Sequence, residues 1–85
     1  MDIQIPSHTL QRAEERGATK AEIIEVIETG TSILSKYGRL AKSKVFPFDN
    51  FRIKKFYDEK KIEVYYMIED QNIITVTVYV FYGKF

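Results

Sequence analysis

The spacing of apolar residues changes at Gly30, and this change limits the fold more than any other feature of the chain. Before Gly30 the apolar residues recur at helical spacing, whereas in most of the later chain they alternate with polar ones, as in half-buried strands. Helices followed by a series of strands predict an α+β domain. We expect one such domain over residues 1–85.

Two helices are expected before the change. The first should span about residues 8–16, with Ser7 as its N-cap and Gly17 just after its end. The second should begin with the capping box Thr19-Lys20-Ala21-Glu22 and end at Thr29-Gly30. Because so few residues separate the two helices, they should form a helical hairpin.

Four strands are predicted after the helices, at residues 44–48, 51–57, 61–69 and 73–82. Turns rich in Asp and Asn are expected between them, at residues 49–50, 58–60 and 70–72. Short connections of this kind predict an antiparallel sheet with the helical hairpin packed on one face. Residues 3–5 are interpreted as a short strand or arm, residues 31–40 as an irregular connection or edge strand, and Pro47 as a mark of an edge or bulge.

Alternation assigns the strand residues to two faces of the sheet. The apolar set should face the helices: Phe51, Ile53, Ile62, Val64, Tyr66, Ile68, Ile74, Val76, Val78 and Val80. The other set should lie on the opposite face: Arg52, Lys54, Glu63, Tyr65, Met67, Thr75, Thr77, Tyr79 and Phe81. A cationic and aromatic face of this kind favours a binding surface. The alternative is that Tyr and Thr are present for strand propensity and cross-strand pairing.

Charge is distributed unevenly although the net charge is only +1. Residues 1–35 carry three basic and six acidic side chains, whereas residues 36–61 carry nine basic and three acidic ones. A local excess of this size could bind a phosphate backbone. A solvated surface rich in lysine is the alternative.

Several classes of site are excluded by composition. The chain has no cysteine and one histidine, so disulfides and thiol nucleophiles are absent, and we expect no metal site and no cofactor. The N-terminus lacks the features of a signal peptide, and the longest apolar run, residues 73–82, is too short to span a bilayer as a helix. We therefore expect a cytoplasmic protein without a membrane partner.

One helical stripe carries His8, Arg12 and Arg16, and Tyr79 belongs to the last predicted strand. This pattern, with Gly17 after Arg16 and a closing Thr77-Val78-Tyr79, resembles a group of small bacterial domains of unknown function. That group belongs to the RelE-like fold clan, which also contains barnase, EndoU, colicin and RelE toxin ribonucleases. The resemblance covers the chain from His8 to Tyr79. It implies a RelE-like fold, RNA cleavage without a metal ion, and an antitoxin that covers the catalytic surface.

The resemblance makes His8, Arg12 and Tyr79 the candidate catalytic residues. Histidine is the residue type best suited to acid–base catalysis near neutral pH, and arginine offers forked donors to phosphate oxygens. Further residues of the basic and aromatic surface are candidates for binding RNA: Arg52, Lys54, Tyr65, Tyr82 and Lys84.

Structural roles remain as alternatives for these residues. His8 could sit beside the helix cap, Arg16 could pair with neighbouring glutamates on a solvated stripe, and Tyr79 could serve packing. At the level of function, near-neutral charge and the absence of a clear catalytic pair favour a non-catalytic binding module. A third hypothesis is a strand-pairing protein, because residues 73–82 at a sheet edge would invite a homodimer or an antitoxin strand.

Overall fold

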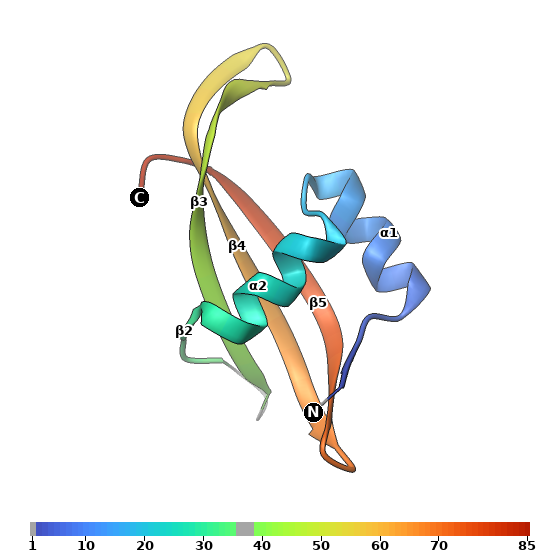
Figure 1. Ribbon diagram of the computed structural model, residues 1–85. Coiled ribbons are helices and arrows are strands. Elements are labelled where there is room, and N and C mark those ends of the chain that lie inside the picture. The colour runs from blue at the N-terminus through green and yellow to red at the C-terminus, as the bar shows by residue number, and fades with distance from the viewer. Residues whose placement is uncertain (1, 36–38) are drawn as a thin grey trace.

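The computed structural model describes residues 2–35 and 39–85. It contains two helices and one sheet, which confirms the α+β class (Figure 1). In chain order the elements are β1 (Ile3–Gln4), α1 (Ser7–Arg16), α2 (Lys20–Thr29), β2 (Thr31–Ser32), β3 (Leu40–Arg52), β4 (Lys55–Glu69) and β5 (Asn72–Gly83). No helix of the described residues has the length and apolar character needed to cross a membrane.

The sheet has five strands in the order β1-β5-β4-β3-β2, so the prediction of four antiparallel strands was wrong. β1 pairs with β5 in parallel, through Ile3 opposite Ile73, while every other pairing is antiparallel. The two added strands lie in the segments that the sequence left ambiguous. Each has only two residues, too few for a recognisable alternation.

Two of the three predicted turns are instead parts of long strands. β3 runs through residues 49–50, where a register shift between Pro47 and Asn50 marks a bulge, and β4 runs through residues 58–60. The chain reverses at Ile53-Lys54, where both residues have positive φ. The predicted turn at residues 70–72 is confirmed, since Asp70 and Gln71 connect β4 to β5.

The predicted helix ends are confirmed at three of four positions. Gly17 adopts φ 102° after α1, and Thr19 and Glu22 exchange both hydrogen bonds of the capping box. Ser7 is not the N-cap, because α1 begins one residue earlier and Pro6 occupies that position without a side-chain bond. The fixed φ of Pro6 sets the entry into the helix, and its carbonyl accepts from the Leu10 N–H at 3.0 Å.

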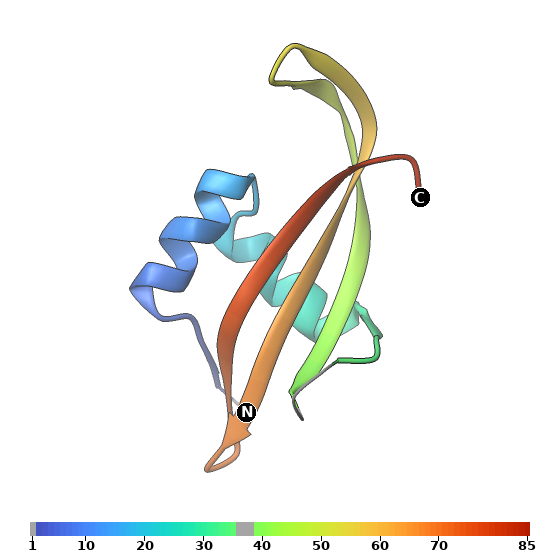
Figure 2. The ribbon, with the colours of Figure 1, turned by 180° about the vertical axis from the view of Figure 1, so that it is seen from behind.

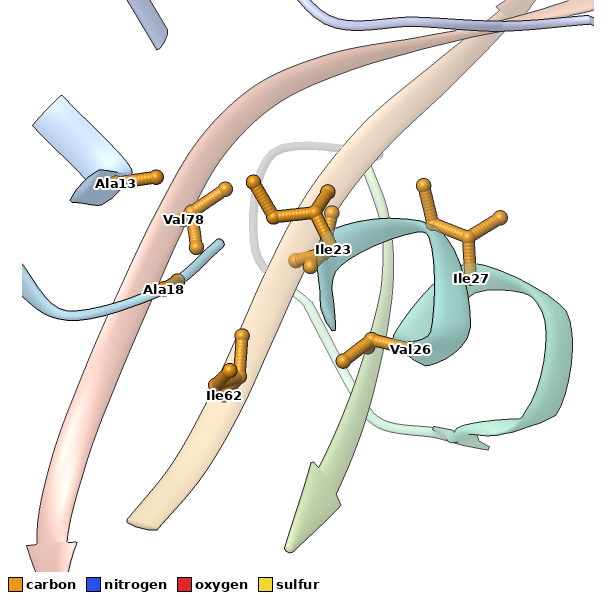
Figure 3. Close-up of a cluster of buried hydrophobic side chains, with 8 residues drawn as sticks. Ala13, Ala18, Ile23, Val26, Ile27, Ile62 and Val78 are labelled. Carbon is orange, nitrogen blue, oxygen red and sulfur yellow. The ribbon is translucent and has the colours of Figure 1, made fainter. Parts of the chain in front are cut away.

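The core lies between the helices and one face of the sheet (Figure 3). α2 crosses that face, while α1 lies beyond it, along the side of β5 (Figures 1 and 2). The buried cluster consists of Ala13, Ala18, Ile23, Val26, Ile27, Ile62, Val64 and Val78. Seen from behind in Figure 2, the opposite face of the sheet has no helix over it within the described residues.

The predicted faces are correct in the middle of the sheet and wrong toward its ends. Ile62, Val64 and Val78 are buried as expected. In β5, however, Tyr65 pairs with Thr77 and Tyr66 with Thr75, so Val76 is an extra residue that shifts the alternation. Thr75 is therefore buried at 1% exposure.

Three residues expected in the core, Phe51, Ile53 and Ile68, are exposed instead. Phe51 and Ile53 belong to the end of the β3–β4 hairpin, which projects beyond both helices (Figure 1). Ile68 lies at the other end of β4, directly before the turn into β5. The apolar and polar residues continue to alternate at these positions, but no helix of the described chain covers them.

Candidate functional site

Two side chains of helix α1 donate hydrogen bonds to backbone carbonyls of β5. Thr9 Oγ1 donates to the Val76 carbonyl at 3.5 Å, and Arg16 Nη1 donates to the Val78 carbonyl at 2.7 Å. Ala13, fully buried, shares this helix face. His8 directly precedes Thr9, and Arg12 directly precedes Ala13. Both residues therefore lie at the border of the contact between α1 and β5.

His8 and Arg12 line one small pocket, which we call the seam pocket. Its other lining residues are Thr9, Val76 and Thr77, and its volume is about 60 Å³. His8 and Arg12 are both exposed. Among the residues the structure describes, neither has a hydrogen-bond or ion-pair partner. Both polar groups are thus available to a ligand entering the pocket.

Tyr79 continues this surface along β5. It lies two residues after Thr77 and is 44% exposed. Its ring centre is 5.4 Å from the guanidinium carbon of Arg16 and 5.7 Å from the ring centre of Tyr65. The structure therefore brings His8 and Arg12 together in the pocket, whereas Tyr79 lies outside its lining, beside Arg16.

The hydroxyl groups of the three candidate tyrosines differ in what they bind. Tyr65 donates to Glu63 at 3.2 Å, and Tyr82 donates to the Arg16 carbonyl at 2.6 Å. Burial, followed by the charge of Glu63, raises the pKa of Tyr65. Burial also raises the pKa of Tyr82, although Arg52 opposes this. The Tyr79 hydroxyl has no hydrogen-bond partner within residues 2–35 and 39–85. Of the three candidate tyrosines, it is therefore the one whose hydroxyl is free to bind a ligand.

Arg52 was predicted on the open face of the sheet, and the structure places it on the helix side. Its Nη2 donates to the Glu15 carbonyl at 2.9 Å, and its guanidinium carbon is 4.9 Å from the centre of the Tyr82 ring. The bulge between Pro47 and Asn50 shifts the alternation before Arg52 is reached. Arg52 and Tyr82 thus join the hairpin to the end of α1.

The two remaining candidates lie apart from the seam pocket. Lys54 is in the turn between β3 and β4, and Lys84 follows β5 near the C-terminus. Lys84 lines a shallow surface depression together with Val45, Pro47, Asp49, Asp58, Glu59 and Phe85. The eight predicted residues therefore do not form one continuous binding face.

Lys60 is a structural residue that we did not predict. It is 8% exposed, and its ammonium group donates to the Gly17 carbonyl and to Glu22, each at 2.9 Å. Burial tends to raise the pKa of Glu22, but the Thr19 N–H and Lys60 outweigh it, so that this pKa is lowered. The alternation in the sequence could have indicated this burial, because Lys60 lies two residues before Ile62 and four before Val64 and so shares their buried face of β4.

Arg16 is also used differently from its prediction. The structural role considered for it was an ion pair with nearby glutamates, but it donates to the Val78 carbonyl and lies over the Tyr79 ring. Nothing in the local sequence indicates this contact, since it joins residues 62 positions apart. Within the described residues there is also no group of three His, Asp or Glu side chains that could hold a metal ion.

Comparison with known proteins gives a family but no activity. No curated protein and no solved structure matches the chain. Residues 5–80 match a family described as "Domain of unknown function (DUF4258)". The match includes the helices, the seam pocket and Tyr79.

Proposed function

The chain belongs to the DUF4258 family of domains of unknown function, and we propose that it is a RelE-like endoribonuclease that binds RNA along the seam pocket. The RelE-like assignment rests on the pattern from His8 to Tyr79. The observation that carries the proposal is the pairing of His8 and Arg12 in one pocket, both without a protein partner in the described chain. Such a toxin would act in the cytoplasm and would need an antitoxin that covers the seam.

The proposed reaction uses the 2′-hydroxyl of the RNA as nucleophile. His8 takes the proton of this hydroxyl as the P–O2′ bond forms and the P–O5′ bond breaks. Tyr79 gives a proton to the departing 5′-oxygen, and Arg12 donates to the phosphate oxygens. The products are a 2′,3′-cyclic phosphate and a 5′-hydroxyl.

Tyr79 lies near the seam pocket along β5. The pocket wall at Thr77 and the ring of Tyr79 are two strand residues apart, roughly 7 Å along the strand. Tyr79 also suits the acid role better than Tyr65 or Tyr82, because both of those hydroxyls already donate to acceptors in the protein.

A non-catalytic binding module is the second candidate. It is favoured by the use of Arg16, Arg52 and Tyr82 in hydrogen bonds to backbone carbonyls. These groups support the fold and are not free to stabilise a phosphorane. The same surface would then bind RNA without cutting it.

The test is cleavage of a labelled single-stranded RNA by the purified protein in the presence of EDTA. We expect wild type to produce cyclic phosphate ends and His8→Ala, Arg12→Gln and Tyr79→Phe each to lower the rate by a factor of about 10² or more. Lys20→Gln is the matched control, since it removes one exposed charge at the start of α2. Cleavage that survives His8→Ala unchanged would refute the proposed base, and RNA binding without cleavage would favour the binding module.

A further inference from the structure

The end of the β3–β4 hairpin is a second exposed surface with a distinct composition. We call residues 50–57 the hairpin tip; β3 and β4 remain paired there as far as Arg52 and Lys55. The tip projects beyond α1 and α2 (Figure 1), at one end of a molecule that is 43 Å long and 21–25 Å across. It is therefore accessible from several sides.

The tip combines positive charge with exposed apolar groups. Its eight residues include Arg52, Lys54 and Lys55 and no acidic side chain. Phe51, Ile53 and Phe56 are 67%, 88% and 47% exposed. The two phenylalanine rings lie edge to face with their centres 5.4 Å apart, and this arrangement leaves ring surface open to a ligand.

Backbone strain at the turn suggests that the tip is not optimised for stability alone. Ile53 has φ 50° and Lys54 has φ 65°, the combination that two-residue hairpin turns usually assign to Asn and Gly. A β-branched residue in this region is a genuine outlier. Ile53 gains little burial in return, and strain of this kind is often found at binding sites.

The base of the tip is fixed to α1. Tyr57 and Tyr82 have ring centres 5.6 Å apart, and Arg52 lies over Tyr82 while it donates to the Glu15 carbonyl. Tyr82 in turn donates to the carbonyl of Arg16 in the last turn of α1. The tip is thus held at a set position relative to the helix that carries His8 and Arg12.

We propose that the hairpin tip is a binding arm for single-stranded RNA. Phe51 and Phe56 offer a stacking surface for an unpaired base, while Lys54 and Lys55 contact backbone phosphates. The choice of RNA rests on the proposed function, and it agrees with the charge of the tip and its paired rings. The arm would hold one segment of a strand while a segment several nucleotides away reaches the seam pocket, because β4 runs ten residues, roughly 33 Å, from Lys55 to Tyr65 beside Thr77.

The proposal is tested by the binding of a fluorescent 12-nucleotide unstructured RNA at several salt concentrations. We expect Phe51→Ala to weaken binding roughly 5- to 160-fold, the usual effect of losing one base–aromatic stack. Replacing Lys54 and Lys55 together by Gln should reduce the slope of log K against log salt by about 1.4. Ile68→Ala, at another exposed apolar side chain, and Lys20→Gln are the matched controls and should bind as wild type does.

The outcomes separate the arm from the catalytic proposal. Tip variants that bind normally while Arg12→Gln binds weakly would overturn the arm and leave the seam pocket intact. If wild type does not cleave RNA but the tip variants bind RNA more weakly than wild type does, the result would support the arm and count against catalysis. Binding of wild type to anionic phospholipid vesicles but not to RNA, lost in Phe51→Ala, would overturn the arm in favour of a membrane contact.

Discussion

Gly17 allows the end of α1 to meet the last strand. Its φ of 102° suits glycine, and a Cβ at this position would collide with the Tyr82 hydroxyl. We expect Gly17→Ala to lower the free energy of unfolding by about 2–4 kcal/mol, from the left-handed backbone and the displaced ring. Urea denaturation measures this loss. Tyr82→Phe, which removes only the bond to the Arg16 carbonyl, should cost about 1 kcal/mol; equal losses would contradict the steric argument.

Glu22 makes the stability depend on acid pH. Its pKa is lowered in the folded protein because the Thr19 N–H and Lys60 outweigh the effect of burial. The contribution is therefore complete above the usual pKa of about 4.5 and is lost as the pH falls through the lowered folded value. We expect Glu22→Gln to cost about 1–2 kcal/mol at pH 7 and to flatten the decline below pH 4.5, as followed by thermal unfolding from pH 3 to 7. An unchanged acid profile would refute this role.

At the scale of elements, helices were more predictable than strands. Capping residues define helix ends locally, so Gly17 and the Thr19 capping box could be identified without knowing the fold. Strand ends depend on the partner strand. The Asp-rich segments at 49–50 and 58–60 resemble turns, yet pairing between β3 and β4 continues through both.

The candidate site was predictable only in part for the same reason. Helical spacing placed His8 and Arg12 on one stripe, but it could not show that this stripe borders β5. That contact depends on Thr9 and Arg16 binding strand carbonyls more than 60 residues away. The bulge at Val76, which determines the faces of β5, likewise has no local signal.

One substitution in the turn of the β3–β4 hairpin should stabilise the protein, whereas most substitutions destabilise proteins. Asn tolerates positive φ far better than Ile, and the Ile53 side chain is 88% exposed. We therefore expect Ile53→Asn to stabilise the protein by about 1 kcal/mol and to raise the melting temperature by about 4–8 °C in calorimetry. Thr31→Asn, an exposed strand substitution without positive φ, is the control. A lower melting temperature would show that Ile53 packs in a way its exposure does not indicate.

At the scale of the whole molecule, several of the basic side chains in residues 36–61 bind other parts of the protein and are not free to bind a ligand. Lys42 and Lys44 reach back to α2, and Lys60 is held by Glu22 and the end of α1. Among the described cations of this segment, Arg39, Lys54 and Lys55 are exposed, and two of these three belong to the hairpin tip. The hairpin tip therefore presents two exposed lysines at one end of an elongated, nearly neutral molecule.

The edges of the sheet determine whether the molecule associates with itself. β1 covers only the beginning of β5, and farther along Arg16 occupies the Val78 carbonyl that another strand would need. We expect wild type to be monomeric and Arg16→Met, which keeps an apolar stem without the donor, to self-associate as its concentration rises. Arg12→Met, on the same helix without a contact to β5 backbone, is the matched control. Sedimentation velocity distinguishes the cases, and a wild-type dimer would support the strand-pairing hypothesis instead.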